Sequence, residues 1–129
     1  YRDLILVING TLTSSAESIC VQVGNGTIST GGYSFVYVVN TISGTASPSF
    51  GLAGHANSTE NSTSITQFFD YSATDKHKTW LGRRGPANSF AGMDASRWAS
   101  TVAIDIMKVF PENYAFAAGT TLSLYGIEA

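Results

Sequence analysis

Hydrophobic positions along the chain recur with the two-residue period of β-strands. Apolar residues alternate with smaller or polar ones across Ile19–Val23, whereas Leu4–Ile8 and Tyr33–Ile42 carry apolar residues on both faces. Alternation of this kind is typical of a strand with one face in the core. A run that is apolar on both faces is typical of a strand at the centre of a sheet, or of one that another subunit covers.

Further strands are expected where β-branched and aromatic residues gather between turn signals. These segments are Phe50–Ala53, Thr63–Tyr71, Lys76–Gly82 and Gly119–Ile127. Polar or glycine-containing segments at 24–26, 56–62 and 72–75 predict the turns and loops that separate strands. The segment Arg83–Ser96 has no clear period and is interrupted by glycine, proline and asparagine, so it is expected to form a long loop.

The segment Ala99–Phe110 fits two patterns. Its apolar residues follow the i, i+3, i+4, i+7 spacing of a helix, yet Val102, Ile104 and Ile106 also alternate as in a strand. β-branched residues lose side-chain freedom in a helix, and a proline follows the segment directly. We therefore predict a strand here, joined by a loop to the closing strand Gly119–Ile127.

The predicted elements amount to about eight short strands without a helix. Strands separated by turns at this spacing indicate an all-β chain, an antiparallel β-sandwich of the jelly-roll-like kind. The polar residues are mainly Ser, Thr, Gly and Asn, which suit strands and turns better than helices. The length of 129 residues predicts one domain over 1–129.

Composition and charge exclude several partners. The net charge is −2 and the pI about 5.5, with no basic stripe that could neutralise phosphates, so nucleic acid is not an expected partner. The longest apolar runs are far shorter than the roughly 20 residues of a membrane helix, so no membrane insertion is expected. The single cysteine, Cys20, excludes an intramolecular disulfide. Because the chain opens on Tyr1 and not on Met, a fragment or a processed product is expected.

No catalytic or metal-binding motif is visible. The histidines His55 and His77 stand 22 positions apart without cysteine companions, which is not the spacing of a zinc site. Asp70, Asp94 and Asp105 form no spaced acid–base pair, and the chain has no Gly-x-Ser-x-Gly elbow. The expectation is a protein without enzymatic activity, metal or cofactor.

Aromatic and arginine residues form the one candidate binding set. Sugars offer flat C–H faces to aromatic rings, and arginine binds hydroxyls, carboxylates and phosphates. The candidate binding residues are Trp80, Arg83, Arg84, Arg97, Trp98 and Tyr114. In the alternative interpretation, both tryptophans are anchors of the core or of a subunit interface.

Four segments resemble β-sandwich modules in tail proteins of tailed bacteriophages, the terminal domains of tail fibres and of minor tail structural proteins. They read SGTASPSFGLAG (43–54), KTWLGRRG (78–85), STVAIDIMKVFP (100–111) and FAAGTTLSLYGI (116–127). The most specific element is the closing pattern that runs from the third segment into the fourth: an aromatic-Pro strand end, a short loop with asparagine, and Gly-Thr-x-x-x-Leu-Tyr-Gly-Ile. The likeness covers roughly Ser43–Ile127.

The resemblance implies a homotrimer at the tip of a fibre, located in the virion and in contact with the host surface. The expected function is receptor binding to a bacterial surface glycan, a polysaccharide or lipopolysaccharide. The family brings no catalytic residues, and its binding loops vary, so no receptor contact transfers by position. Two alternatives remain open at this point: a purely structural tail or capsid-decoration module, and a capsule-degrading enzyme with carboxylates shared between subunits.

Overall fold

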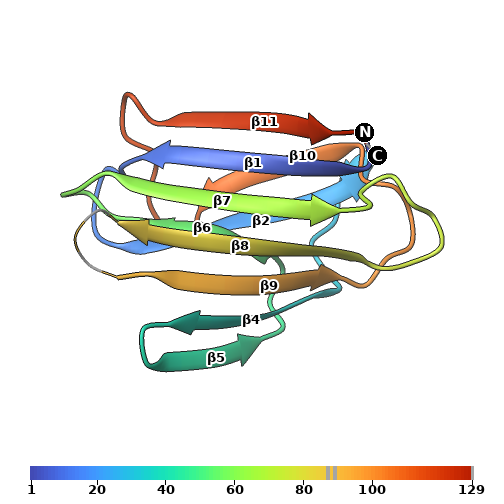
Figure 1. The fold of residues 1–129 in the computed structure, drawn as a ribbon, viewed down its shortest axis with the longest axis horizontal. Helices are drawn as coiled ribbons and strands as arrows, with labels where there is room; N and C mark the ends of the chain where they lie inside the picture. The colour runs from blue at the N-terminus through green and yellow to red at the C-terminus, as the bar shows by residue number, and fades with distance from the viewer. Residues whose placement is uncertain (87, 89, 129) are drawn as a thin grey trace.

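The computed structural model describes residues 1–86, 88 and 90–128 and shows β-strands arranged in two layers (Figure 1). The strands are β1 (Asp3–Gly10), β2 (Glu17–Asn25), β3 (Thr27–Ile28), β4 (Tyr33–Val39), β5 (Ile42–Ala46), β6 (Gly51–Ala56), β7 (Ser62–Phe69), β8 (Lys78–Pro86), β9 (Gly92–Trp98), β10 (Ile106–Pro111) and β11 (Thr121–Ile127). These residues form eleven strands, against about eight predicted, and no helix, so none that could cross a membrane. The prediction of an all-β chain is confirmed.

Two antiparallel sheets face each other, and Figure 1 shows the larger one in front. The larger sheet has seven strands in the order β11-β1-β7-β8-β9-β4-β5. The smaller sheet has the order β10-β2-β3, and β6 also pairs with β2. The chain crosses repeatedly between the layers, as expected for the jelly-roll-like antiparallel β-sandwich that the sequence predicts, and that fold class is confirmed.

The hydrophobic core lies between the sheets and decides which side chains face outward. Its members include Leu6, Val21, Phe68, Trp80 and Trp98. Along β8, buried and more exposed positions alternate, so Trp80 faces the core while Leu81 faces away from it. Full burial of a large apolar side chain stabilises the fold by about 1.5–3 kcal/mol. A shift of one position along a strand would exchange its two faces, so the core sets the register of the whole sheet.

Strand β2 is more buried than its alternating pattern predicts. Its outward residues Cys20 and Gln22 are buried as well as its inward ones. The Gln22 amide donates a hydrogen bond to the backbone carbonyl of Ser49 (2.9 Å), in the segment that leads into β6. The expectation of a half-buried strand is therefore wrong, because the chain before β6 covers the second face.

The apolar run Tyr33–Ile42 forms two strands and not one. It ends β4 at Val39 and begins β5 at Ile42, and the two strands pair as a hairpin. Asn40 has a φ of 51°, in the left-handed region that asparagine tolerates better than most residues. This turn folds the run back on itself, so the prediction of one continuous strand is wrong.

The predicted loop Arg83–Ser96 is mostly β-structure. Strand β8 continues to Pro86, and β9 begins at Gly92, while positions 87 and 89 lie outside the described residues. The pattern misleads because β9 buries polar side chains: the Ser96 hydroxyl accepts a hydrogen bond from the backbone N–H of Leu52 (3.1 Å). A polar residue that is satisfied across the core can occupy an inward position without an apolar period in the sequence.

The ambiguous segment contains a strand only in its second half. Strand β10 covers Ile106–Pro111, and residues 99–105 contain neither helix nor strand. The preceding segment is held by Ile104, whose N–H donates to the carbonyl of Tyr71 (2.8 Å). The two closing strands do not pair with each other, because β10 joins β2 in the smaller sheet while β11 joins β1 in the larger one.

Candidate functional site

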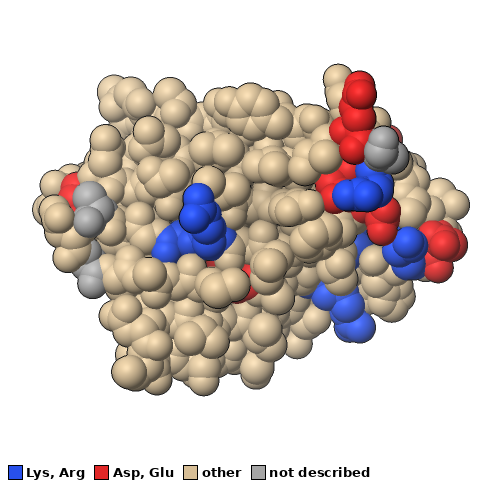
Figure 2. All heavy atoms as spheres, viewed as in Figure 1, with Lys and Arg blue, Asp and Glu red and all other residues tan. Residues whose placement is uncertain are grey.

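The outward side chains of the seven-stranded sheet form a broad surface, which we call the outer face. Its exposed positions include large hydrophobic residues in the three strands β8, β9 and β4: Leu81, Met93, Val36 and Val38. Figure 2 shows a largely uncharged surface with a basic group in its left half and most other charges at the right-hand end. An exposed apolar patch of this extent on a protein surface often marks a binding site.

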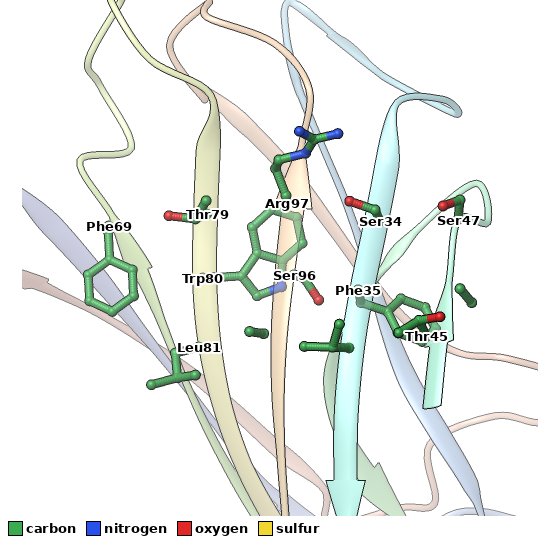
Figure 3. Close-up of a pocket in the computed structure, with 13 residues that line it drawn as sticks. Ser34, Phe35, Thr45, Ser47, Phe69, Thr79, Trp80, Leu81, Ser96 and Arg97 are labelled. Carbon is green, nitrogen blue, oxygen red and sulfur yellow. The ribbon is translucent and has the colours of Figure 1, made fainter. Parts of the chain in front are cut away.

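One groove on the outer face ends at Arg97, and we call it the Arg97 groove. It has a volume of about 520 Å³. The register places Phe69, Thr79, Arg97 and Ser34 side by side on four adjacent strands. Figure 3 shows Arg97 at one end of the groove, with Thr79 and Ser34 on either side of it. A guanidinium between two hydroxyls, with an aromatic ring beyond, is the polar end of this site.

The floor of the Arg97 groove is apolar. In the next outward row, Leu81, Ala95 and Val36 lie opposite one another on β8, β9 and β4. Ala95 is smaller than its neighbours on both sides, so the surface is lowered above β9. The groove therefore combines an apolar floor with hydroxyl groups and one cation at its end.

A second groove lies further along the same strands, and we call it the Arg83 groove. It has a volume of about 660 Å³, and Arg83 stands in it between Ile65 and Met93 in the sheet register. Glycine and alanine on β8 and on the approach to β9, Gly85 and Ala91, leave room beside these long side chains. The second groove repeats the chemistry of the first: one exposed arginine among apolar groups.

The two arginines are separated along the sheet by a distance that the register fixes. Arg97 lies opposite Thr79, and Arg83 is four positions beyond Thr79 on β8. At a rise of about 3.4 Å per residue, the two arginine backbones are about 14 Å apart. Within the described residues, neither arginine forms an ion pair, and no carboxylate, histidine or cysteine lines either groove.

The two tryptophans predicted as binding residues are both buried, although Trp80 is also among the residues that line the Arg97 groove (Figure 3). Trp80 is 1% exposed, lies against Phe68 (ring centroids 5.2 Å apart), and donates its indole N–H to the carbonyl of Leu52 (2.7 Å). Trp98 is buried and stacks on Tyr33. Both tryptophans are core anchors, as the alternative interpretation had it, and they support the outer face from beneath.

Arg84 is also an interior residue, contrary to its prediction as a binding residue. Its side chain is 4% exposed and forms an ion pair with the fully buried Asp94, with Nε and Oδ2 3.5 Å apart. Its Nη1 donates to the carbonyl of Gly54 (3.0 Å). Burial raises the pKa of the Asp94 carboxyl, and the charge of Arg84 opposes that rise. This pair ties the larger sheet to β6 and leaves no free guanidinium for a ligand.

Tyr114 is exposed but lies apart from the two grooves. It belongs to the connection between β10 and β11, and neither groove includes it. The buried carboxylate of Glu17 holds this connection, because it accepts hydrogen bonds from the backbone N–H groups of Asn113 and Tyr114 (3.0 and 2.9 Å). Of the six candidate residues, only Arg83 and Arg97 are exposed on the outer face, while Trp80 and Arg84 line the grooves as buried residues.

Several groove residues were not identified from the sequence. Ser34, Phe69, Thr79 and Ala95 are unremarkable in the linear pattern, and only the strand register brings them together. One signal was present: Tyr33–Ile42 carries apolar residues on both faces, which predicts a strand at the centre of a sheet or one that another subunit covers.

No protein-family model matches this chain, and neither a curated protein nor a solved structure matches it.

Proposed function

We propose that this chain is a non-enzymatic adhesion domain that binds a glycan on the bacterial surface through its outer face, as part of a tailed-phage tail fibre in the virion. The observation that carries the proposal is the Arg97 groove, with a polar row of Thr79, Arg97 and Ser34 beside an apolar row. A sugar ring is amphipathic in the same way, since its C–H faces are apolar and its rim is made of hydroxyls.

The dimensions of the outer face support a ligand of several sugar units. The Arg97 groove has about 520 Å³, within the range of about 300–1,000 Å³ that is typical of small-molecule sites. The Arg83 groove extends the surface along the same three strands. An extended chain of sugars could therefore contact both grooves at once, and its binding would combine many weak contacts.

The assignment to a phage tail rests on the resemblance of the sequence segments 43–54, 78–85, 100–111 and 116–127. The last two of these contain β10 and β11, whose strands belong to the sandwich itself and not to the grooves. In such an arrangement the segments 100–111 and 116–127 are scaffold, whereas the segment 78–85 contributes Thr79, Leu81 and Arg83 to the grooves. The specificity belongs to the outward side chains of β8, β9 and β4.

The test is direct binding of the purified protein to a panel of immobilised bacterial polysaccharides and lipopolysaccharides. The variant Ala95→Trp fills the floor of the Arg97 groove, and it should bind at least about tenfold more weakly, a loss of 1.4 kcal/mol. Ala118→Trp is the matched control, because Ala118 is exposed on the β10–β11 connection outside both grooves. Binding that is equal for both variants contradicts the proposal.

A second candidate function, a structural tail or capsid-decoration module, is favoured by the edge strand β11. Its residues Leu122, Leu124 and Tyr125 are exposed, Leu124 to 54%, and one backbone edge of β11 is unpaired in the described sheet. Apolar side chains beside an open edge suit the packing of another copy. We propose association of three copies through this edge.

The oligomer proposal is tested by the mass in solution. A trimer has three times the 13.6 kDa mass of one chain, and Leu124→Glu should reduce it to the mass of a single chain. A wild-type mass of one chain refutes the trimer. Two results together would favour the structural function over adhesion. Leu124→Glu would abolish assembly, and Ala95→Trp would bind the glycan as well as the wild type does.

A further inference from the structure

We propose that the outer face is selective for an acidic polysaccharide, and that Arg83 and Arg97 each bind the carboxylate of a uronic acid unit. This inference rests on the proposed function, because it names the class of glycan that the same surface takes. The inference gives the positive charges of the two arginines a role in binding, whereas the binding of a neutral glycan would not need them.

The charge distribution on the outer face favours an anionic partner. The whole chain has a net charge of −2, yet among the residues that the structure describes, the only charged side chains lining the two grooves are arginines. Arg84, at the edge of the Arg83 groove, already pairs with Asp94 on the inner side of β9. Arg83 and Arg97 have no such partner among the described residues. The surface therefore offers two uncompensated positive charges within an otherwise acidic protein.

The surroundings of Arg97 favour a sugar that carries its own carboxylate. Its guanidinium can hold a carboxylate through two parallel N–H···O bonds, while Thr79 and Ser34 lie close enough along the row to meet neighbouring hydroxyls. Directly beside this row, the Leu81, Ala95 and Val36 floor suits the apolar face of the same ring. A uronic acid joins all three features in one unit, whereas a phosphate linker between sugars places its charge away from any ring face.

The distance between the two arginines favours a polymer over a single sugar. Their backbones are about 14 Å apart, as four residues along β8 and β9 imply. One sugar ring cannot reach both, but a polysaccharide with repeated carboxylates can occupy both grooves on one chain. Once one arginine holds the polymer, the second arginine meets the next carboxylate at a high effective concentration. The affinity for the polymer should therefore exceed the affinity of either contact alone.

The experiment compares chemically matched probes. Polygalacturonate and hyaluronate are each immobilised before and after reduction of their carboxyl groups to alcohols, which leaves a neutral polymer with the same backbone, and a phosphomannan serves as the phosphate probe. The protein should bind the acidic forms at least about tenfold more tightly than the reduced forms, and binding should weaken as salt rises.

The variants assign the effect to the two arginines. Arg97→Gln and Arg83→Gln should each weaken binding of the acidic polymers about tenfold, because a hydrogen-bonded contact to a charged group is lost. Lys108→Gln is the matched control, since it makes the same change of net charge on β10 of the other sheet. Arg97→Lys should restore only part of the affinity, because lysine lacks the bidentate geometry.

The outcomes separate this inference from the proposed function. Equal binding of acidic and reduced polymers, equal loss with Lys108→Gln, or a preference for phosphomannan overturns the acidic-sugar assignment. So does the absence of binding to every uronic polymer. In each of these cases the glycan-binding proposal is decided separately, by Ala95→Trp against the bacterial polysaccharide panel.

Discussion

Arg83 and Arg84 are neighbours on β8, yet they belong to two regions with opposite properties. Arg83 lies on the outer face, exposed and without an ion pair among the described residues, whereas Arg84 lies between the sheets with its charge held by Asp94. Trp80 and Leu81 show the same contrast on the same strand. The outer face is apolar with isolated cations, and the layer beneath it contains buried polar groups as well as hydrophobic ones. The direction in which a side chain leaves the sheet therefore decides whether it is exposed on the outer face or buried in the layer beneath.

The largest expected difference between the regions concerns Trp80 and Leu81. Trp80→Ala removes a buried ring and its hydrogen bond to Leu52, and it should lower the free energy of unfolding by about 4 kcal/mol. Leu81→Ala should lower it by less than about 1 kcal/mol, because Leu81 is an exposed residue of the outer face. Urea unfolding of both variants measures the difference. Similar losses of unfolding free energy in the two variants would show that Leu81 is buried in solution, with its face of the sheet covered.

The buried ion pair gives the next largest effect. Asp94→Asn leaves the Arg84 guanidinium without its counter-charge, and it should cost about 3 kcal/mol in the free energy of unfolding. Arg83→Gln, one position away on the other face, should change it by less than about 0.5 kcal/mol. The double variant Asp94→Asn, Arg84→Met should recover part of the loss, since it removes the unpaired charge. A loss of less than about 1 kcal/mol for Asp94→Asn would contradict the assignment of this pair to the interior.

A smaller effect is expected from His55, the histidine nearest to this interior layer. Burial first, and then the charge of Arg84, lower its pKa from 6.5 to about 4. Its neutral form is therefore favoured in the folded chain, and the unfolded chain binds more protons between these two values. The stability that His55 contributes is complete above about pH 6.5 and is lost as the pH falls toward 4.

Because His55 is only partly buried, the loss should amount to about 1–2 kcal/mol. Urea unfolding at several pH values measures it, as the difference between wild type and His55→Gln, which should narrow as the pH falls from 6.5 to 4. Asp94 is present in both proteins, so its contribution to the pH dependence cancels in this difference. That contribution has the opposite sign, because burial raises the pKa of Asp94. His77→Gln, at an exposed position, is the control for the replacement of a histidine by glutamine.

The sequence allowed most of the strand positions to be predicted, and it failed where the core accepts polar groups. Strand β9 was taken for part of a loop, because its inward residues include Asp94 and Ser96 and its outward ones include Ala95. The partners that make those inward positions acceptable, Arg84 and the N–H of Leu52, come from other strands. The pattern of apolar residues along one strand does not reveal a buried polar residue whose partner comes from another strand.

The candidate site was predicted only in part, for a related reason. All of the candidates were chosen by their chemistry, but Trp98 and Arg84 stand next to an exposed arginine in the sequence, and Trp80 stands three positions before Arg83. Adjacent residues in a strand face opposite sides of the sheet, so only one member of each such pair can be exposed on a given face. The hydroxyls and small residues of the grooves have no signal of their own, since they matter only through their neighbours in the sheet.

The sequence by itself determined that the chain is an all-β sandwich, because alternation, β-branched residues and turn signals act over a few residues at a time. Only the tertiary structure decided which face of each strand is buried and which strands are neighbours. Those choices depend on contacts between distant residues, such as Trp80 with Leu52 and Arg84 with Asp94. They turned two predicted binding tryptophans into core anchors and brought two distant arginines, Arg83 and Arg97, onto one surface.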